Sequence, residues 1–206
     1  MNKILITGSE GYIGSVLTPM LVNRGYNVVG LDICYYSEGN LYDYIFPNYK
    51  LINKDIRDIK KDDLKDMGYS AVIHLAALSS DPLGMLDEQL TYDVNYKASV
   101  KLATLAKRAG ISRFIFASSC SLYGQGSGHA LTEESPSNPQ TAYGKSKIYA
   151  EQEISKLADE NFSPVFMRNA TAFGIAPRMR FDIVVNNLTG FAKVDHEIKI
   201  FGDGKP

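Results

Sequence analysis

The chain has very little of the chemistry that builds disulfide frameworks or metal centres. It contains two cysteines, Cys34 and Cys120, and three scattered histidines in 206 residues. Neither a disulfide scaffold nor a metal cluster is therefore expected, and no metal is assigned. A nucleophilic thiol at Cys120 is disfavoured because no histidine lies near it in the sequence. The scarcity of cysteine fits a reducing compartment, and we expect a cytoplasmic protein.

Charge of one sign and long hydrophobic runs are lacking too. The net charge is −1, so no broad attraction to nucleic acid or to an anionic membrane is expected. No apolar run approaches the roughly 18 residues of a membrane-spanning helix. The first apolar run is short and passes directly into a glycine turn, unlike a signal peptide. The length suits one α/β domain with a full core.

What the chain does have is a group of three closely spaced glycines after the apolar run 4–6. Gly8 would allow a tight turn, Gly11 would let the backbone approach a phosphate, and Gly14 would let the next helix pack close to the strand. The N–H groups of that helix's first turn would point at the anion. The pattern indicates a dinucleotide site, although an ordinary strand–turn–helix connection has similar glycines.

A second apolar strand, over 27–32, ends in an acid. Asp32 lies 18 residues beyond Gly14, close to the roughly 20 residues expected for the carboxylate that binds the ribose hydroxyls. A carboxylate there repels a 2′-phosphate, and no Arg or Lys follows it over 33–35. These features favour NAD over NADP. Taken alone, Asp32 is also an ordinary residue for a turn at a strand end.

Strand candidates alternate with helical stretches along the chain. Continuous apolar runs such as 114–117 are typical of strands buried on both faces of a parallel sheet. The alternation predicts an α/β fold with a doubly wound (Rossmann) parallel sheet flanked by helices. Pro19 is expected to kink the first helix or end its regular bonding. Strands are expected at 3–7, 27–32, 49–53, 71–76, 113–118 and 164–168, and helices at about 12–24, 60–66, 90–109, 141–160 and 180–193.

One candidate for acid–base chemistry is a tyrosine followed by a lysine four residues later. Tyr143 and Lys147 would share one face of a helix. A tyrosine is a useful acid or base only if its pKa of about 10 is lowered, and a nearby ammonium favours the phenolate. Because the chain has 13 tyrosines, a pair at this spacing also arises by chance, so the spacing alone is no support.

Hydroxyl side chains follow the fifth expected strand, at Ser118, Ser119 and Ser121. Ligands bind at the carboxyl ends of strands in a doubly wound sheet, where hydroxyls can donate to a substrate oxygen. A polar turn that caps its own backbone is the other interpretation. His74, inside an apolar strand, is interpreted as a packed core residue.

Together these segments resemble the extended short-chain dehydrogenase/reductase family, in its branch of NAD-dependent nucleotide-sugar epimerases and dehydratases. Each match is modest, and their joint order along nearly the whole chain carries the resemblance. The matching segments are TGSEGYIG at 7–14, Asp32, KDIRD at 54–58, HLAA at 74–77, Asn95, SSCSLYG at 118–124, YGKSK at 143–147 and NNL at 186–188.

The resemblance implies that NAD is the cofactor and that one set of residues binds it. The glycine turn would cradle the pyrophosphate and Asp32 would bind the adenosine ribose. Lys147 would hydrogen-bond the nicotinamide ribose, and Asn95 would support the active-site helix or a relay water. The implied cofactor residues are Gly8, Gly11, Tyr12, Ile13, Gly14, Asp32, Asp55, Ile56, Leu75, Ala76, Ala77, Asn95, Tyr143 and Lys147.

The resemblance also implies a catalytic set. Tyr143 would take a proton from a sugar hydroxyl, Lys147 would lower the tyrosine pKa, and Ser119 would hold the reacting oxygen. The nucleotide-sugar substrate would contact Ser119, Ser121, Asn186 and Asn187, the two asparagines at its diphosphate. A homodimer through the helices near 90–109 and 141–160 is expected by analogy.

The chain departs from the family pattern in three places. Cys120 and Ser121 stand where 4,6-dehydratases of this branch have Asp-Glu, which disfavours dehydration. Thr171 stands where many relatives have Asn, which puts one usual substrate contact in doubt. Relatives continue beyond residue 206. We therefore expect an NAD-binding domain over 1–170 and, over 171–206, the start of a truncated, incomplete C-terminal substrate lobe.

The leading prediction is an NAD-dependent epimerase that acts on a nucleotide-activated sugar by transient oxidation to a keto-sugar. An NAD-linked nucleotide-sugar ketoreductase or dehydrogenase is the alternative. A non-catalytic dinucleotide-binding protein is the third interpretation, because a fold does not fix a function. It is disfavoured because such a protein has no need for Ser119, Tyr143 and Lys147 together.

Overall fold

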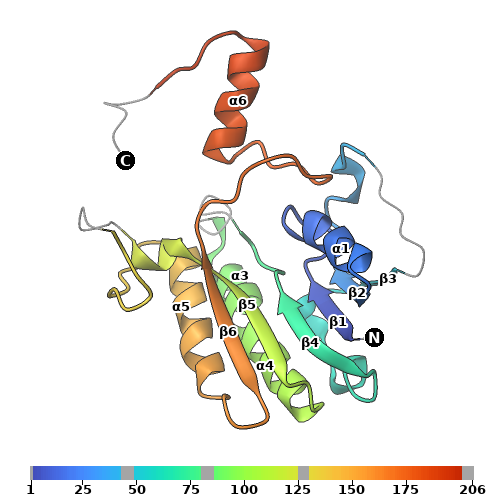
Figure 1. Cartoon of the computed structure of the whole chain (residues 1–206). Coiled ribbons are helices and arrows are strands. Elements are labelled where there is room, and N and C mark those ends of the chain that lie inside the picture. Colours follow the sequence, from blue (N-terminus) through green and yellow to red (C-terminus); the bar gives the residue numbers. More distant parts are fainter. Residues whose placement is uncertain (1, 43–48, 80–85, 125–129, 201–206) are drawn as a thin grey trace.

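A six-stranded parallel sheet forms the centre of the molecule, with the strand order β3-β2-β1-β4-β5-β6 (Figure 1). The computed structural model describes residues 2–42, 49–79, 86–124 and 130–200. The strand order is that of a doubly wound dinucleotide-binding fold, so the predicted fold class is confirmed. The strands are β1 (Lys3–Thr7), β2 (Asn27–Asp32), β3 (Lys50–Asn53), β4 (Tyr69–His74), β5 (Arg113–Ser119) and β6 (Ser163–Asn169).

Apolar residues on both faces of the strands explain the continuous hydrophobic runs in the sequence. On β1, Leu5 belongs to the larger core cluster, together with Leu102 and Ala106 of helix α4 (Ala98–Arg108). Its neighbours Ile4 and Ile6 belong to a second cluster on the opposite face. Successive side chains of a strand point to opposite faces, so a strand covered on both sides must be apolar throughout.

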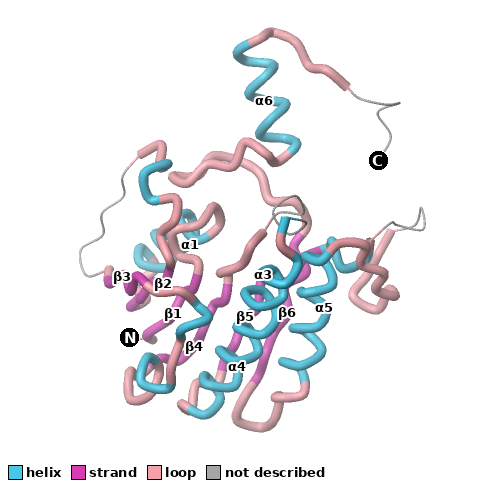
Figure 2. Tube along the Cα trace, turned by 180° about the vertical axis from the view of Figure 1, so that it is seen from behind, coloured by secondary structure: helices cyan, strands magenta, loops and turns pink. Residues whose placement is uncertain are grey.

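The helices form layers on the two faces of this sheet. Figures 1 and 2 show α1 (Gly14–Asn23) on one face, and α4 and α5 (Ala142–Ser155) on the other. Helix α3 (Glu88–Tyr92) lies beside α5 and continues through a π-helical turn, Asp93–Lys97, into α4. The expected helix over 90–109 is therefore three consecutive helical pieces.

Two further expectations about helices need correction. The stretch expected over 60–66 contains only a short 3₁₀ helix, Lys61–Asp63, and a second one, Ile56–Asp58, precedes it. Helix α1 continues past Pro19 to Asn23, so the proline does not end the helix. Only the one backbone bond that Pro19 cannot donate is lost. The fourth strand begins at Tyr69, two residues before the expected start.

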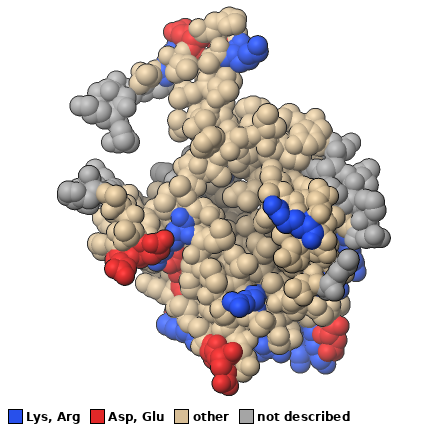
Figure 3. Space-filling view, viewed as in Figure 1, with Lys and Arg blue, Asp and Glu red and all other residues tan. Residues whose placement is uncertain are grey.

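The chain leaves the sheet at the end of β6 and leads to helix α6 (Val184–Val194), which lies beyond the carboxyl ends of the strands (Figure 1). A domain boundary near residue 170 stays a prediction. Figure 3 shows acidic and basic side chains interspersed over one face, with no broad patch of either sign. No helix of the described residues has both the length and the apolarity needed to cross a bilayer.

Candidate active site

The glycine turn after β1 has the geometry that its sequence predicted. Gly8 has φ +73° and donates its N–H to Leu31 O at 2.8 Å. A Cβ on Gly8 would lie 2.6 Å from the backbone nitrogen of Ala76, and one on Gly14 would collide with Gly8 O. The close approach of β4 and α1 to the turn therefore requires glycine at both positions. Gly11 N donates to Gly8 O at 3.2 Å, which closes the turn.

Asp32 ends β2 beside this turn. Its carboxylate accepts the Glu10 N–H at 3.0 Å and the Cys34 N–H at 2.8 Å. Burial raises the pKa of Asp32 above its usual value, and the nearby Glu10 carboxylate acts in the same direction. The acid thus lies where the two strand-to-loop connections meet, as expected for a ribose-binding carboxylate.

A tyrosine from the start of β3 fills the space left by a glycine of β2. A Cβ on Gly30 would collide with the Tyr49 hydroxyl and with Ser9 Oγ. The Tyr49 hydroxyl donates to Glu10 Oε1 at 2.7 Å and lies 2.9 Å from Ser9 Oγ. Strand β2 is therefore joined to the glycine turn through the side chain of Tyr49.

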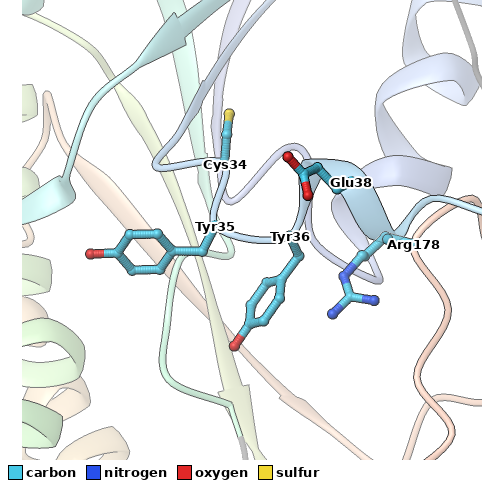
Figure 4. Close-up of a pocket in the computed structure, with 6 residues that line it drawn as sticks. Cys34, Tyr35, Tyr36, Glu38 and Arg178 are labelled. Atoms are coloured by element: carbon cyan, nitrogen blue, oxygen red, sulfur yellow. The ribbon is translucent and has the colours of Figure 1, made fainter.

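A cavity of about 430 Å³ opens beyond Asp32. Figure 4 shows the Arg178 side chain directed at the Tyr36 ring, and the guanidinium carbon lies 4.3 Å from the ring centroid. Arg178 comes from a segment that also pairs with the loop after β2, since Leu41 N donates to Pro177 O at 2.8 Å. The cavity is lined by Cys34, Tyr35, Tyr36, Glu38, Gly39 and Arg178. The sequence reasoning placed no cation here.

The remaining residues expected along the cofactor follow β3 and β4. Asp55 binds Arg57 through both carboxylate oxygens, and this pairing lowers the pKa of Asp55. Ile56 is buried in the larger core cluster. Leu75 N donates to Thr7 O at 2.9 Å, which holds the start of the Leu75–Ala77 segment against β1.

His74 is a core residue, as predicted. Its Nδ1 lies 2.6 Å from Thr7 Oγ1, and its Nε2 lies 2.7 Å from Ser99 Oγ. Ser99 donates its proton to Asn95 O, so Nε2 of His74 carries hydrogen and Nδ1 accepts from Thr7. Burial is the main cause that lowers the pKa of His74 to about 3, with the Lys147 charge acting in the same direction.

Helix α5 presents Tyr143 and Lys147 on one face. Lys147 Nζ lies 5.7 Å from the centroid of the Tyr143 ring and 4.7 Å from that of Phe116. It donates to Ala117 O of β5 at 2.8 Å. Burial lowers the pKa of Lys147 to about 8, while the Glu151 carboxylate raises it. The ammonium is thus held between helix α5 and strand β5.

Ser119 lies in the turn against which α5 begins. Its Oγ donates to Ser121 Oγ at 3.1 Å and accepts the Ser121 N–H at 3.2 Å. A Cβ on Gly144, the residue after Tyr143, would lie 2.9 Å from Ser121 O. The first turn of α5 therefore rests directly on the serine turn, which brings the elements carrying Ser119 and Tyr143 together.

Three asparagines expected at the site hold backbone groups. Asn95, in the π-helical turn, accepts from Leu78 N at 2.8 Å and donates to Leu78 O at 3.0 Å. Asn186 is buried and bonds to the Tyr12 hydroxyl, Arg180 O and Gly174 N. Asn187 donates to Phe181 O at 3.1 Å. Substrate contacts by Asn186 and Asn187 stay predictions.

Comparison with known proteins follows this geometry. Residues 4–206 match the model of the NAD-dependent epimerase/dehydratase family. The chain belongs to this family. A UDP-glucose 4-epimerase of Neisseria meningitidis serogroup C is 32% identical over 187 residues, which cover 84% of this chain and 54% of that protein. The chain spans about half the length of the curated relatives it matches.

Solved structures of the family share the fold. An NAD-dependent NDP-hexosamine 5,6-dehydratase, TunA, aligns with a TM-score of 0.83 at 27% identity, over 99% of this chain and 65% of its own. A UDP-glucuronic acid 4-epimerase from Bacillus cereus, in complex with NAD, aligns with a TM-score of 0.80 at 29% identity, over 98% of this chain and 66% of its own. Both epimerases and dehydratases therefore lie among the similar structures.

An ion pair that the sequence did not predict joins helix α5 to strand β6. Arg168 on β6 donates to both carboxylate oxygens of Glu151 on α5, with Nη2 2.8 Å from Oε2. Its Nη1 donates to the Tyr123 hydroxyl at 2.9 Å and to Glu133 O at 2.8 Å. The only signal in the sequence was the position of Glu151, four residues after Lys147 on the same helix face.

No group of three or more potential metal-binding side chains occurs within residues 2–42, 49–79, 86–124 and 130–200. His129 lies outside these residues. Cys120, in the turn after β5, is a free and exposed cysteine.

Proposed function

We propose that this chain forms the NAD-binding and catalytic part of an epimerase that acts on a nucleotide-activated sugar. The observation that carries the proposal is Lys147 Nζ, 5.7 Å from the Tyr143 ring, on a helix that rests on the Ser119 turn. The similar epimerases named above support the reaction class. The structure with NAD supports the cofactor.

The residues present fit NAD. The turn at Gly8 and Gly14 has no room for a Cβ at either position, and a carboxylate, Asp32, ends the neighbouring strand. The cavity lined by Tyr36 and Arg178 supplies further space at the same end of the sheet. When bound, NAD supplies an acceptor for hydride from a sugar carbon.

The chain's own side chains would handle the proton. The buried ammonium of Lys147 stabilises the phenolate form of Tyr143, which takes the proton of the sugar hydroxyl and becomes neutral tyrosine. Ser119 donates to the oxygen of the keto-sugar and holds it in place. After the sugar has presented its other face, Tyr143 would return the proton to the keto oxygen as the hydride returns to the sugar carbon, so no net redox change would occur.

Replacing Tyr143 by Phe tests this assignment. The ring and its packing are retained, while the only proton-carrying group of the side chain is lost. We expect the epimerisation rate to fall at least about a hundredfold, in line with the contribution of a general base. The measurement is product formation from UDP-glucose and related nucleotide sugars, with NAD affinity as the control. Near-normal turnover by the variant would contradict the assignment.

A net redox enzyme is separated from an epimerase by the fate of the cofactor. An epimerase yields an isomeric sugar nucleotide with no accumulation of NADH, whereas a dehydrogenase accumulates NADH in proportion to product. Cys120 and Ser121, at the position of the Asp-Glu pair of 4,6-dehydratases, support epimerisation over dehydration. A product lighter than the substrate by one water would overturn that preference.

A further inference from the structure

One side-chain cluster outside the proposed chemistry joins the glycine turn to the segment before α6. The Tyr12 hydroxyl donates to Gly174 O at 2.7 Å and accepts from Asn186 Nδ2 at 3.0 Å. The Asn186 amide also donates to Arg180 O at 2.9 Å and accepts the Gly174 N–H at 2.9 Å. The Tyr12 hydroxyl is thereby bonded to Gly174 and Asn186, which lie 162 and 174 positions further along the sequence.

These contacts give both polar groups of the Asn186 side chain a partner. Both amide hydrogens have acceptors and the carbonyl oxygen has a donor. Asn186 is 7% exposed, so breaking this set would leave buried polar groups without partners. Both backbone groups of Gly174, at φ +120°, bond to the same two side chains.

The geometry points to Asn186 as a positioning residue that couples the cofactor turn to the 174–186 segment through the Tyr12 hydroxyl. We call these contacts the Tyr12–Asn186 latch. It goes beyond the proposed function and rests only on the binding of NAD at the glycine turn. Because Tyr12 belongs to that turn, ordering the turn by NAD also orders the segment that leads to α6. The coupling is reciprocal, so loosening the segment weakens NAD binding.

Asn187 supplies a matched control. It occupies the next position of the same helical turn, but its amide donates to Phe181 O and makes no bond to Tyr12. Asn186→Leu and Asn187→Leu therefore remove the same amide from neighbouring positions. Tyr12→Phe removes only the hydroxyl and keeps the ring, which lines a cavity together with Ile13 and Phe173.

The first readout is NAD affinity by calorimetry, with no sugar nucleotide present. We expect Asn186→Leu and Tyr12→Phe each to weaken NAD binding about fivefold or more, the lower range of typical coupling. The double variant should be little weaker than either single one, because both act through the same contact. Asn187→Leu should bind NAD like the unaltered chain.

The second readout is hydrogen–deuterium exchange of the 172–186 peptide without any ligand. The Gly174 amide should exchange faster in both latch variants and at the normal rate in Asn187→Leu. Adding NAD should slow exchange of this peptide in the unaltered chain and in Asn187→Leu, but not in the two latch variants. If Asn186→Leu instead matches Asn187→Leu in both readouts, the latch is refuted.

The outcomes also separate this inference from the cofactor assignment. Failure of the unaltered chain to bind NAD would contradict the cofactor part of the proposed function, while the ligand-free exchange rates would still test the latch. Loss of UDP-sugar binding in Asn186→Leu, with NAD affinity and exchange unchanged, would make Asn186 a substrate ligand and overturn its positioning role. Tyr12→Phe keeps the test valid if Asn186→Leu does not fold.

Discussion

At the scale of single residues, Lys147 combines a position in the candidate active site with an electrostatic cost of burial. Its side chain is 3% exposed, and its ammonium faces Ala117 O, the Tyr143 and Phe116 rings, Glu151 on its own helix, and the neutral His74. Burial opposes the charge, and the single carboxylate offsets this only in part. The residue is therefore poised to titrate near neutral pH, unlike an exposed lysine.

This makes the stability of the chain depend on pH in a defined direction. The folded-state pKa of Lys147, about 8, lies below the unfolded value of 10.5. Between these values the unfolded state binds more protons, so the contribution of Lys147 to stability rises with pH. It is fully present above pH 10.5 and is lost as the pH falls through about 8. Epimerase activity should follow the opposite course and decline above pH 8 as the ammonium is lost.

Urea unfolding across this pH range provides the measurement. Lys147→Met should lack the rise in unfolding free energy that the unaltered chain shows. Lys65→Met, at a lysine with a 54% exposed side chain, serves as the control and should retain the rise. Parallel slopes for Lys147→Met and the unaltered chain would contradict a lowered pKa at Lys147.

At the scale of elements, helix α5 is held at both ends. Thr141 caps its start by accepting the Gly144 N–H at 3.1 Å, and Gly144 allows close contact with Ser121 O. Further along, Glu151 is bonded to Arg168 of β6. The helix that carries Tyr143 and Lys147 is thus fixed between two neighbouring elements, which preserves the distance between the two side chains.

Removing the Arg168 side chain should loosen this arrangement. In Arg168→Met, the Glu151 carboxylate, whose side chain is 8% exposed, loses its hydrogen-bonded ion-pair partner. Breaking a buried pair costs roughly 3–5 kcal/mol, and the 22% exposure of Arg168 reduces our expectation to about 2 kcal/mol of unfolding free energy. Lys156→Met breaks the exposed pair with Glu153 and should change stability by less than about 0.5 kcal/mol. Equal losses in urea unfolding would contradict the buried role of Arg168.

The sequence predicted elements where local pattern decides their type. The apolar runs located all six strands to within two residues, because burial on both faces leaves a continuous signal. The helix expected over 60–66 does not form, since the charged residues there form only a short 3₁₀ helix. The π-helical turn at Asp93–Lys97 carries no local signal that a single sequence reveals. Within this turn, the Asn95 side chain accepts from Leu78 N, and the Asn95 backbone oxygen accepts from Ser99 Oγ.

The candidate site likewise has features that local sequence predicts and contacts that it does not predict. The tight turn at Gly8, the position of Asp32 at a strand end and the shared helix face of Tyr143 and Lys147 follow from local spacing, whereas the catalytic roles came only from the family resemblance, and the roles of all these residues stay predictions. The Tyr12–Asn186 latch, the Arg168–Glu151 pair and the approach of Arg178 to Tyr36 join distant segments. Their partners are set by how the sheet brings those segments together, which spacing along one sequence does not encode.

At the scale of the whole molecule, the preference for NAD over NADP should depend on the Asp32 carboxylate at the end of β2. NAD at a hundred times its dissociation constant should stabilise the folded chain by about 2.7 kcal/mol and raise Tm accordingly. NADP should raise Tm less, because Asp32 and the adjacent Glu10 carboxylate repel a 2′-phosphate. Asp32→Asn should reduce the difference between the Tm increases that NAD and NADP produce. Asp66→Asn, at an exposed acid, serves as the control and should leave that difference in Tm unchanged. Equal Tm increases with NAD and NADP in the unaltered chain would contradict the preference for NAD.

The occupation of the space at Gly30 by the Tyr49 hydroxyl has a consequence for how this family member can diverge. Any side chain at position 30 meets that hydroxyl, and loss of the hydroxyl leaves Ser9 and Glu10 without their shared partner. A change at either position alone therefore brings a collision or an unfilled polar space. We expect Gly30 and Tyr49 to be retained or replaced together during evolution, with Ser9 adjusting to any side chain at position 30.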